Sequence, residues 1–298
     1  MRATVPRLIT PPADETPVYP YARVWRSLVL QLGALGAVAL ALFVLDLVGV
    51  IVPASLHVPV HVALALLPLI LWFIFAWLPE LRVMEPRTGL ETILIVTALA
   101  ASGAALPVIE RLFQVERWLP TADPTTRIVG YTVTLGALQE VIKYLIVRSM
   151  AWEYRLRVRV DALAYAATAA IGYATVLAVS EILRGASAPS AAAFEVFNLV
   201  ALSVGPGLIV AYGLGEARLG TPTAFLLVIS VALAALLFGV TSTLRGALVN
   251  ARLGLAISAP SPLVGFAIDV GLLLLTGLIV ALLIVNSERR ERERLLRE

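Results

Sequence analysis

The stretch Gly136-Ala137-Leu138-Gln139-Glu140-Val141-Ile142-Lys143-Tyr144-Leu145 lies inside an apolar run, Ile128 to Met150, that is long enough to cross a bilayer. A carboxylate and an ammonium near the middle of a membrane span are costly, so they normally face a partner or a wet cavity. Glu140 and Lys143 are three residues apart, on one helix face and within pairing distance. This stretch is therefore the first candidate for a functional site.

Lys143 is the only lysine in the chain, and at every other position with a permanently positive side chain the residue is arginine. A compact ammonium with a shiftable pKa is not interchangeable with a guanidinium, which points to a specific requirement at this position. A structural alternative stays open, because Glu140 and Lys143 could simply neutralise each other so that the helix can insert into the bilayer.

The composition is that of an all-α, polytopic integral membrane protein. Hydrophobic residues make up 60% of the 298 residues, charged residues 14%, and the mean hydropathy is +0.92. The chain has no cysteine, which excludes disulfides, thiolate catalysis and cysteine-ligated metals. We expect the lipid bilayer as a partner, and no nucleic acid.

About eight apolar segments are each near the roughly 20 residues that a membrane span requires. The predicted spans are Ser27–Val52, His61–Leu78, Gly89–Ile109, Ile128–Met150, Val160–Leu183, Ala191–Leu214, Thr223–Val249 and Leu263–Asn286. The predicted organisation is a proline-rich cytoplasmic arm (1–26), an eight-span membrane domain (27–286) and a charged cytoplasmic tail (287–298). Arginines concentrate in the loops and ends on one side, which predicts that both termini are cytoplasmic.

Two loops carry further expectations. The longest, Glu110 to Arg127, contains aromatic and charged residues and predicts a short helix at head-group level. The loop between the first two spans, Pro53 to Pro59, is expected to hold His57 and to place His61 beside it, in a plain interfacial role.

Among the further charged residues of the predicted spans, five are candidates for a structural or a functional role. Arg245 and Asp269, on consecutive antiparallel spans, are the first candidates for a purely structural ion pair. Asp161 stands at a span start, where a carboxylate is favoured by the helix dipole. Asp46 and Glu181 lie toward the outer ends of their spans. For each of the five residues an interhelical ion pair or a snorkelled side chain is the alternative to catalysis.

Small residues indicate where the helices meet. The fifth span is rich in alanine, and the sixth contains Gly205-Pro206-Gly207, which predicts a broken or kinked helix. Broken backbone is tolerated only against protein or a water-filled cavity. We therefore expect the fourth to seventh spans to surround a polar cavity with Gln139, Glu140 and Lys143 on one wall.

Two stretches together resemble the PrsW-type intramembrane proteases, relatives of the CAAX-prenyl-protease and bacteriocin-processing membrane enzymes. They are Gln139-Glu140-Val141-Ile142-Lys143-Tyr144-Leu145 and, after an arginine-rich loop, the segment from Asp161 to Ala174. The likeness covers about residues 128–249. It implies cleavage of membrane-anchored substrates, such as a single-pass membrane protein, with a carboxylate that activates water. It also suggests a prokaryotic plasma membrane.

The resemblance assigns roles residue by residue. Glu140 and Lys143 match the second glutamate and the lysine of the family's first motif, and Gln139 stands where its first glutamate is expected. Asp161 and Tyr165 match the opening of the next motif. On this basis the catalytic candidates are Glu140, Lys143, Gln139 and Glu181, and the substrate-binding candidates are Asp161, Tyr165 and Tyr173.

The chain departs from the family pattern at several positions. Leu177 occupies the place of a glutamate, and Glu181, one helical turn further on, is its possible substitute. The positions of the family's histidines fall near Pro206 or Gly207 and near Gly239, and none of these is histidine. Zinc requires at least three good ligands and an open position, so no metal site is predicted, and the cofactor is unknown.

Three functions stay open at this point. The first is an intramembrane protease with Glu140 as base. The second is a degenerate relative that binds membrane helices or regulates a partner without cutting. The third is a transporter with Glu140 and Lys143 in a polar path, although no internal repeat supports it. Convergence of Glu140, Lys143 and Glu181 on one closed cavity would favour the first, dry pairs the second, and a continuous polar track the third.

Overall fold

The computed structural model describes residue 10 and residues 23–50, 52–153, 155–184, 188–220, 225–250 and 262–297. These residues form helices and turns, and seven helices are long and apolar enough to cross a membrane. The chain is therefore an all-α polytopic membrane protein, as predicted. Most of the predicted proline-rich arm lies outside the described residues.

The seven spanning helices match seven of the predicted spans, with longer bounds for several. They are α1 (Arg23–Leu47), α2 with its extension to α3 (Ala54–Glu80), α4 with its extension (Leu90–Thr121), α8 (Arg159–Arg184), α9 (Pro189–Leu219), α10 (Leu226–Asn250) and α11 (Pro262–Leu295). The predicted fourth span forms one further helical segment. It consists of α6 (Pro124–Tyr131), a π-helical turn (Thr132–Gly136) and α7 (Ala137–Ala151).

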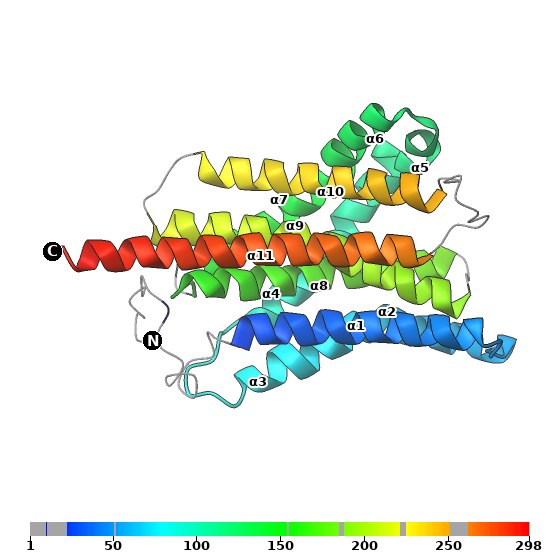
Figure 1. Ribbon diagram of the computed structural model, residues 1–298, viewed down its shortest axis with the longest axis horizontal. Helices are drawn as coiled ribbons and strands as arrows, with labels where there is room; N and C mark the ends of the chain where they lie inside the picture. The colour runs from blue at the N-terminus through cyan, green and yellow to red at the C-terminus, as the bar shows by residue number, and fades with distance from the viewer. Residues whose placement is uncertain are drawn as a thin grey trace.

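Helices α8 and α9 form the centre of the bundle (Figure 1). In their most apolar stretches 72% and 83% of the residues are buried, against 28% in α1 and α11. The small side chains of α8 permit this close packing. At Gly172 an added Cβ would lie 2.6 Å from the backbone oxygen of Leu94 in α4, so only glycine fits there.

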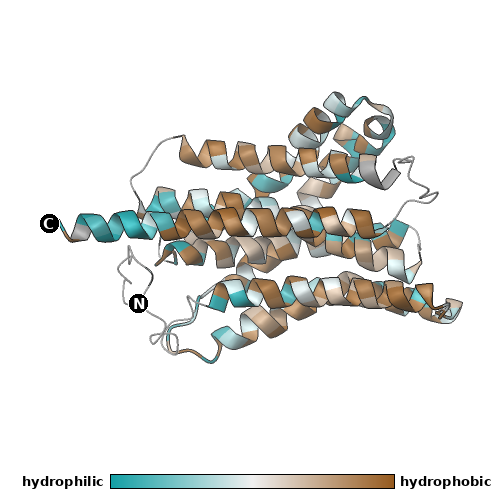
Figure 2. Cartoon of the chain, in the orientation of Figure 1, coloured by the Kyte–Doolittle hydropathy of each residue, from teal (hydrophilic) through white to brown (hydrophobic). Residues whose placement is uncertain are grey.

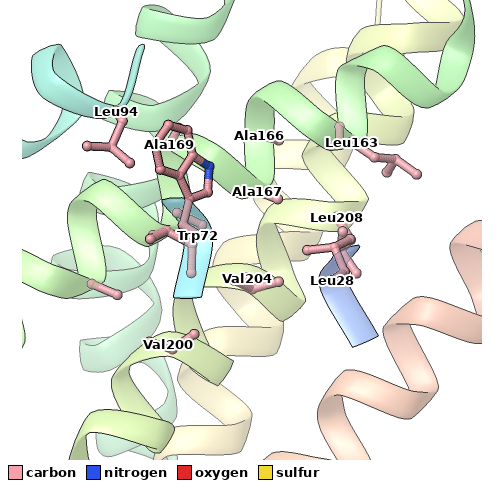
Figure 3. Packing of buried hydrophobic residues seen from close by; sticks show 14 of the residues in the cluster. Leu28, Trp72, Leu94, Leu163, Ala166, Ala167, Ala169, Val200, Val204 and Leu208 are labelled. Atoms are coloured by element: carbon pink, nitrogen blue, oxygen red, sulfur yellow. The ribbon is translucent and has the colours of Figure 1, made fainter. Parts of the chain in front are cut away.

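The core on this central pair combines small residues of α8 with larger side chains from its neighbours (Figure 3). Trp72 of α2 reaches over Ala167 and Ala169 and donates its indole N–H to Thr168 Oγ1 at 3.0 Å. A buried Trp needs such a partner for its N–H, so this bond fixes how α2 meets α8.

The outer helices turn large apolar side chains outward. Leu274, Leu278 and Leu282 of α11 and Val228 and Ile229 of α10 are each about 60% exposed or more. Hydropathy colouring shows the same apolar surface along the bundle, with polar colour gathered at the helix ends and in the tail of α11 (Figure 2). Such a surface is compatible with lipid as its solvent.

The two ends of the bundle differ in the helix ends and short helices that lie there. Helix α1 begins and α11 ends at the same end, which we call the termini end (Figure 1). Thr10 also lies there, where its backbone N–H donates to Glu288 Oε1 of α11 at 3.3 Å. We call the other end, with α5 (Val115–Trp118) and the start of α6, the far end.

At the termini end the arginine-rich loop meets a buried ion-pair network. The Arg87 guanidinium donates to Glu80 at 2.6 Å and to Asp161 at 2.8 Å. Asp161 also accepts the backbone N–H groups of Arg157 and Val158 at 2.9 and 3.1 Å. The predicted role of Asp161 as a helix-start carboxylate is confirmed.

The segment between the third and fourth predicted spans contains the expected short helix, α5, followed by a 3₁₀ turn, Leu119–Thr121. Asp123 then caps α6 by accepting the Thr126 N–H at 3.0 Å. Hydrogen bonds from the Thr126 hydroxyl and backbone lower the pKa of this exposed carboxyl.

Two sequence expectations are wrong. Helix α2 begins at Ala54, so His57 belongs to a helix and not to a loop, and its Nε2–H donates to the Val52 carbonyl at 2.9 Å. His61, expected at the interface, is buried in the same helix. Helix α9 runs unbroken through Gly205-Pro206-Gly207, so the predicted break in the helix does not occur. The second error has a clear physical reason, which lies in the contacts of Gln139 and Lys143.

Candidate functional site

Glu140 and Lys143 form a buried ion pair on α7. Lys143 Nζ lies 2.7 Å from Glu140 Oε1, and the side chains are 4% and 0% exposed. Gln139 Nε2 donates to the same oxygen at 3.1 Å. Among the described residues Glu140 Oε2 has no hydrogen-bond partner. The carboxylate is thus held on one side by two donors from its own helix.

Gln139 and Lys143 also donate to the backbone of α9. Gln139 Nε2 bonds the Leu202 carbonyl at 3.1 Å, and Lys143 Nζ bonds the Ser203 carbonyl at 2.6 Å. Pro206 has no N–H, so the Leu202 carbonyl, four residues earlier, lacks its usual helical donor. A proline in a membrane helix is tolerated when neighbouring side chains satisfy the freed carbonyl groups. Gln139 does this for Leu202, which explains why α9 continues through Pro206.

Close packing around the start of α7 holds these side chains in place. At Gly136, in the π-helical turn before α7, an added Cβ would lie 2.6 Å from the backbone oxygen of Ala235 in α10. At Gly207 of α9 it would lie 3.5 Å from Lys143 Nζ. Glycine at position 136 therefore lets α7 approach α10, whereas a Cβ at position 207 would make only ordinary contact with Lys143. π turns of this kind are frequent at functional sites.

The space beside the ion pair is small. A cavity of about 10 Å³ is lined by Glu140, Lys143, Tyr144, Gly207 and apolar residues of α7 to α9. That volume is at the lower limit of what one water molecule occupies. The described structure therefore leaves no room at Glu140 for a peptide.

A second cavity, of about 420 Å³, reaches from Gln139 to the far end; we call it the far cavity. Its inner lining is mainly apolar, with Gln139 and Tyr173, and its rim is charged. The lining residues include Leu106, Ile109, Tyr131, Leu135, Gln139, Tyr173, Leu177, Leu199, Leu202 and Phe238 inside, and Glu116, Glu181, Arg184, Glu195 and Arg245 toward the rim. Its size and mixed lining are those of a ligand-binding pocket.

Arg245 connects two carboxylates at this rim. It lies 3.6 Å from Asp269 and 3.3 Å from Glu195, so the predicted Arg245–Asp269 pair is confirmed. The separation from Asp269 exceeds a hydrogen bond, and neither Asp269 oxygen has a hydrogen-bond partner among the described residues. Asn198 Oδ1 and Ser242 Oγ, whose residues line the far cavity, also have no hydrogen-bond partner among the described residues. Asn198 and Ser242 thus contribute buried polar atoms without a protein hydrogen-bond partner to the wall of the far cavity, whereas Asp269 lies behind Arg245 and outside the cavity lining.

The predicted site residues divide into three places. Gln139, Tyr173 and Glu181 line the far cavity. Glu140 and Lys143 do not line it and form the buried ion pair next to Gln139. Glu181 is held at the rim by Arg184 at 3.0 Å.

Asp161 and Tyr165 lie at the termini end, where the Tyr165 hydroxyl donates to the Thr88 carbonyl at 3.2 Å. They stand at the start of α8 and Glu181 near its end, so the length of the helix separates them.

Sequence reasoning missed the α9 carbonyl groups of Leu202 and Ser203 and the network arginine Arg87. Pro206 could have indicated the free carbonyl of Leu202, because a proline inside a predicted span leaves the carbonyl four residues earlier without its donor. No comparable signal marks Arg87, which lies in a loop. Among the described residues, no group of three or more His, Cys, Asp or Glu side chains could hold a metal ion.

Comparison of the chain with protein-family models, with curated proteins and with solved structures gave no significant match.

Proposed function

We propose that this protein is a non-catalytic membrane protein that binds a membrane helix of a partner in the far cavity. One observation carries the proposal. The side chains that the sequence singles out as catalytic, Gln139 and Lys143, are used to satisfy carbonyl groups of α9 and to hold Glu140. They support the inner end of the cavity and are not directed at a bound molecule.

Hydrolysis is less well supported by this arrangement. A general base must lie within hydrogen-bond reach of the attacking water, with the scissile carbonyl beside it. Glu140 borders only about 10 Å³ of space, and the large cavity stops at Gln139. On this proposal the likeness to PrsW-type proteases concerns the helix arrangement, and the hydrolytic function has been lost with the first glutamate and the histidines.

Transport is also less well supported. The far cavity and the small cavity lie on either side of the layer formed by Gln139, Glu140 and Lys143, whose side chains are buried. A transporter needs a path that opens alternately on both sides of such a layer. The hydrogen bonds from this layer to α9 hold it closed.

The lining of the far cavity indicates the class of ligand. Apolar side chains from the helical segment after α4 (Leu106 and Ile109) and from α8, α9 and α10 form the inner part, and Glu181, Arg184 and Arg245 stand at the rim. The end of a single-pass membrane helix fits this pattern, with its apolar turns inside and its polar terminus at the charged rim. The arginine-rich, lysine-poor chain supports a prokaryotic plasma membrane with both termini cytoplasmic as its location.

Crosslinking in native membranes tests the proposal. A photoreactive amino acid at Leu177, inside the far cavity, should give a discrete adduct with one membrane protein, and Leu199→Trp should weaken it by narrowing the cavity. A probe at Leu278, on the exposed face of α11, is the matched control and should give no such adduct.

Glu140→Gln separates binding from proteolysis, because glutamine can still accept from Lys143 but cannot act as a base. We expect the adduct to survive and the membrane proteome to match that of the intact strain. Accumulation of the same uncut single-pass protein in the Glu140→Gln and deletion strains would establish proteolysis and end the proposal. The melting temperature and membrane abundance of the variant check that it is folded.

A further inference from the structure

A third cavity, of about 260 Å³, lies at the termini end, away from the far cavity. It is formed where α8 begins, α9 ends and the tail of α11 passes beside them (Figure 1). Its lining is polar and consists of Arg159, Tyr212, Glu216, Gly220, Leu226, Ser287, Arg290, Glu291 and Arg294. We call it the tail cavity.

The charges of the tail cavity do not cancel. Arg159 Nε lies 2.7 Å from Glu216, and Arg294 lies 3.9 Å from Glu291, so each carboxylate has an arginine. The third arginine, Arg290, donates to Ser287 Oγ at 3.2 Å, and no ion pair is found for it within the described part of the chain. The lining therefore carries one guanidinium in excess of its carboxylates.

Neutral donors stand beside that guanidinium. The hydroxyls of Tyr212 and Ser287 are 3.3 Å apart, and Ser287 is buried. A guanidinium with neighbouring hydroxyl groups is the donor set that binds a phosphate, because it offers parallel N–H groups and charge-assisted hydrogen bonds.

The position of the tail cavity along α11 indicates where such a phosphate would come from. Helix α11 is apolar from Val270 to Val285 except for Thr276, and it is charged from Glu288 onward, a change visible in Figure 2. The exposed apolar side chains of Leu282 and Val285 lie within about one to two turns of Ser287. The cavity thus lies at the boundary between lipid tails and head groups, where basic pockets bind anionic lipid.

We propose that the tail cavity binds the phosphate group of an anionic membrane lipid, with Arg290, Ser287 and Tyr212 as donors. The acyl chains then follow the exposed apolar flank of α11. Bound lipid holds the tail of α11 against the ends of α8 and α9, at the opposite end of the bundle from the proposed partner site.

Native mass spectrometry of the full chain tests the proposal, with phosphatidylglycerol and phosphatidylcholine as probes. We expect retained phosphatidylglycerol on the intact protein and at least a fivefold loss in Arg290→Gln. Arg289→Gln is the matched control, because Arg289 is adjacent on α11 but does not line the tail cavity and is paired with Glu293. It should retain the lipid.

Equal losses in both variants, or equal retention of the two lipids, would show only general surface attraction and overturn the proposal. A second arm identifies the source of the phosphate. If millimolar inorganic phosphate displaces phosphatidylglycerol and raises the melting temperature in an Arg290-dependent way, the site takes soluble phosphate and the lipid assignment fails.

Discussion

At each end of the helix bundle one arginine pairs with several carboxylates, but the side chains are buried at one end and exposed at the other. At the termini end Arg87 bridges Glu80 and Asp161, and all three side chains are at most 9% exposed. At the far end Arg184 pairs with Glu110, Glu116 and Glu181, whose side chains are 43–77% exposed. One arginine with several carboxylates forms a closed structural joint in the first case and a wet rim in the second.

The difference follows from what surrounds each arginine. Around Arg87 the carboxylates also accept backbone N–H groups, so the loops before α4 and α8 are tied together without a large cavity. Around Arg184 the helices separate and enclose the far cavity. We infer that the termini end maintains the fold while the far end can accept a partner, and the following experiments test this contrast.

The largest effect is expected for Arg87→Met at the termini end. The substitution leaves Glu80 and Asp161 as buried carboxylates without their guanidinium, and breaking a buried pair in this way costs about 3–5 kcal/mol of unfolding free energy. Denaturant unfolding in detergent micelles measures it. The triple variant Arg87→Met, Glu80→Gln, Asp161→Asn should recover part of the loss. A change below about 1 kcal/mol for Arg87→Met would contradict the assignment.

The second experiment concerns the layer that separates the two ends. Gln139→Leu leaves the Leu202 carbonyl without a donor and should cost about 1–3 kcal/mol. In a Pro206→Ala background the cost should fall at least by half, because a backbone N–H at position 206 can then bond Leu202. A double-mutant cycle on unfolding free energies gives this coupling. Strict additivity would show that Gln139 does not replace the bond missing at Pro206.

Much of the fold was predictable, because membrane helices need long apolar segments and the sequence contains them. The pairing of Arg245 with Asp269 was also predictable, since consecutive antiparallel spans place the two residues at similar depth. The helix-start role of Asp161 followed from local helix geometry. These features depend on one segment or on two neighbouring segments.

The features that could not be predicted depend on contacts between distant segments. The position of Gln139 under Leu202 requires knowledge of how α7 crosses α9, which no residue pattern states. The location of Arg87 beside Asp161 depends on loop structure in the same way. The start of α2 at Ala54 was missed because Pro59 was interpreted as a loop residue, whereas it lies inside α2, where proline lacks a helical N–H donor.

The smallest effect is expected at the rim of the far cavity, for Arg184→Gln. Its partners are exposed enough for water and salt to screen them, so the loss in unfolding free energy should be about 0–1 kcal/mol. Added salt should reduce the difference further, whereas the effect of Arg87→Met should persist in salt because its partners are buried. Unfolding at low and high ionic strength compares the two variants directly. If Arg184→Gln were as destabilising as Arg87→Met, the far end would be a structural joint as well, and the proposal that it opens to a partner helix would lose its basis.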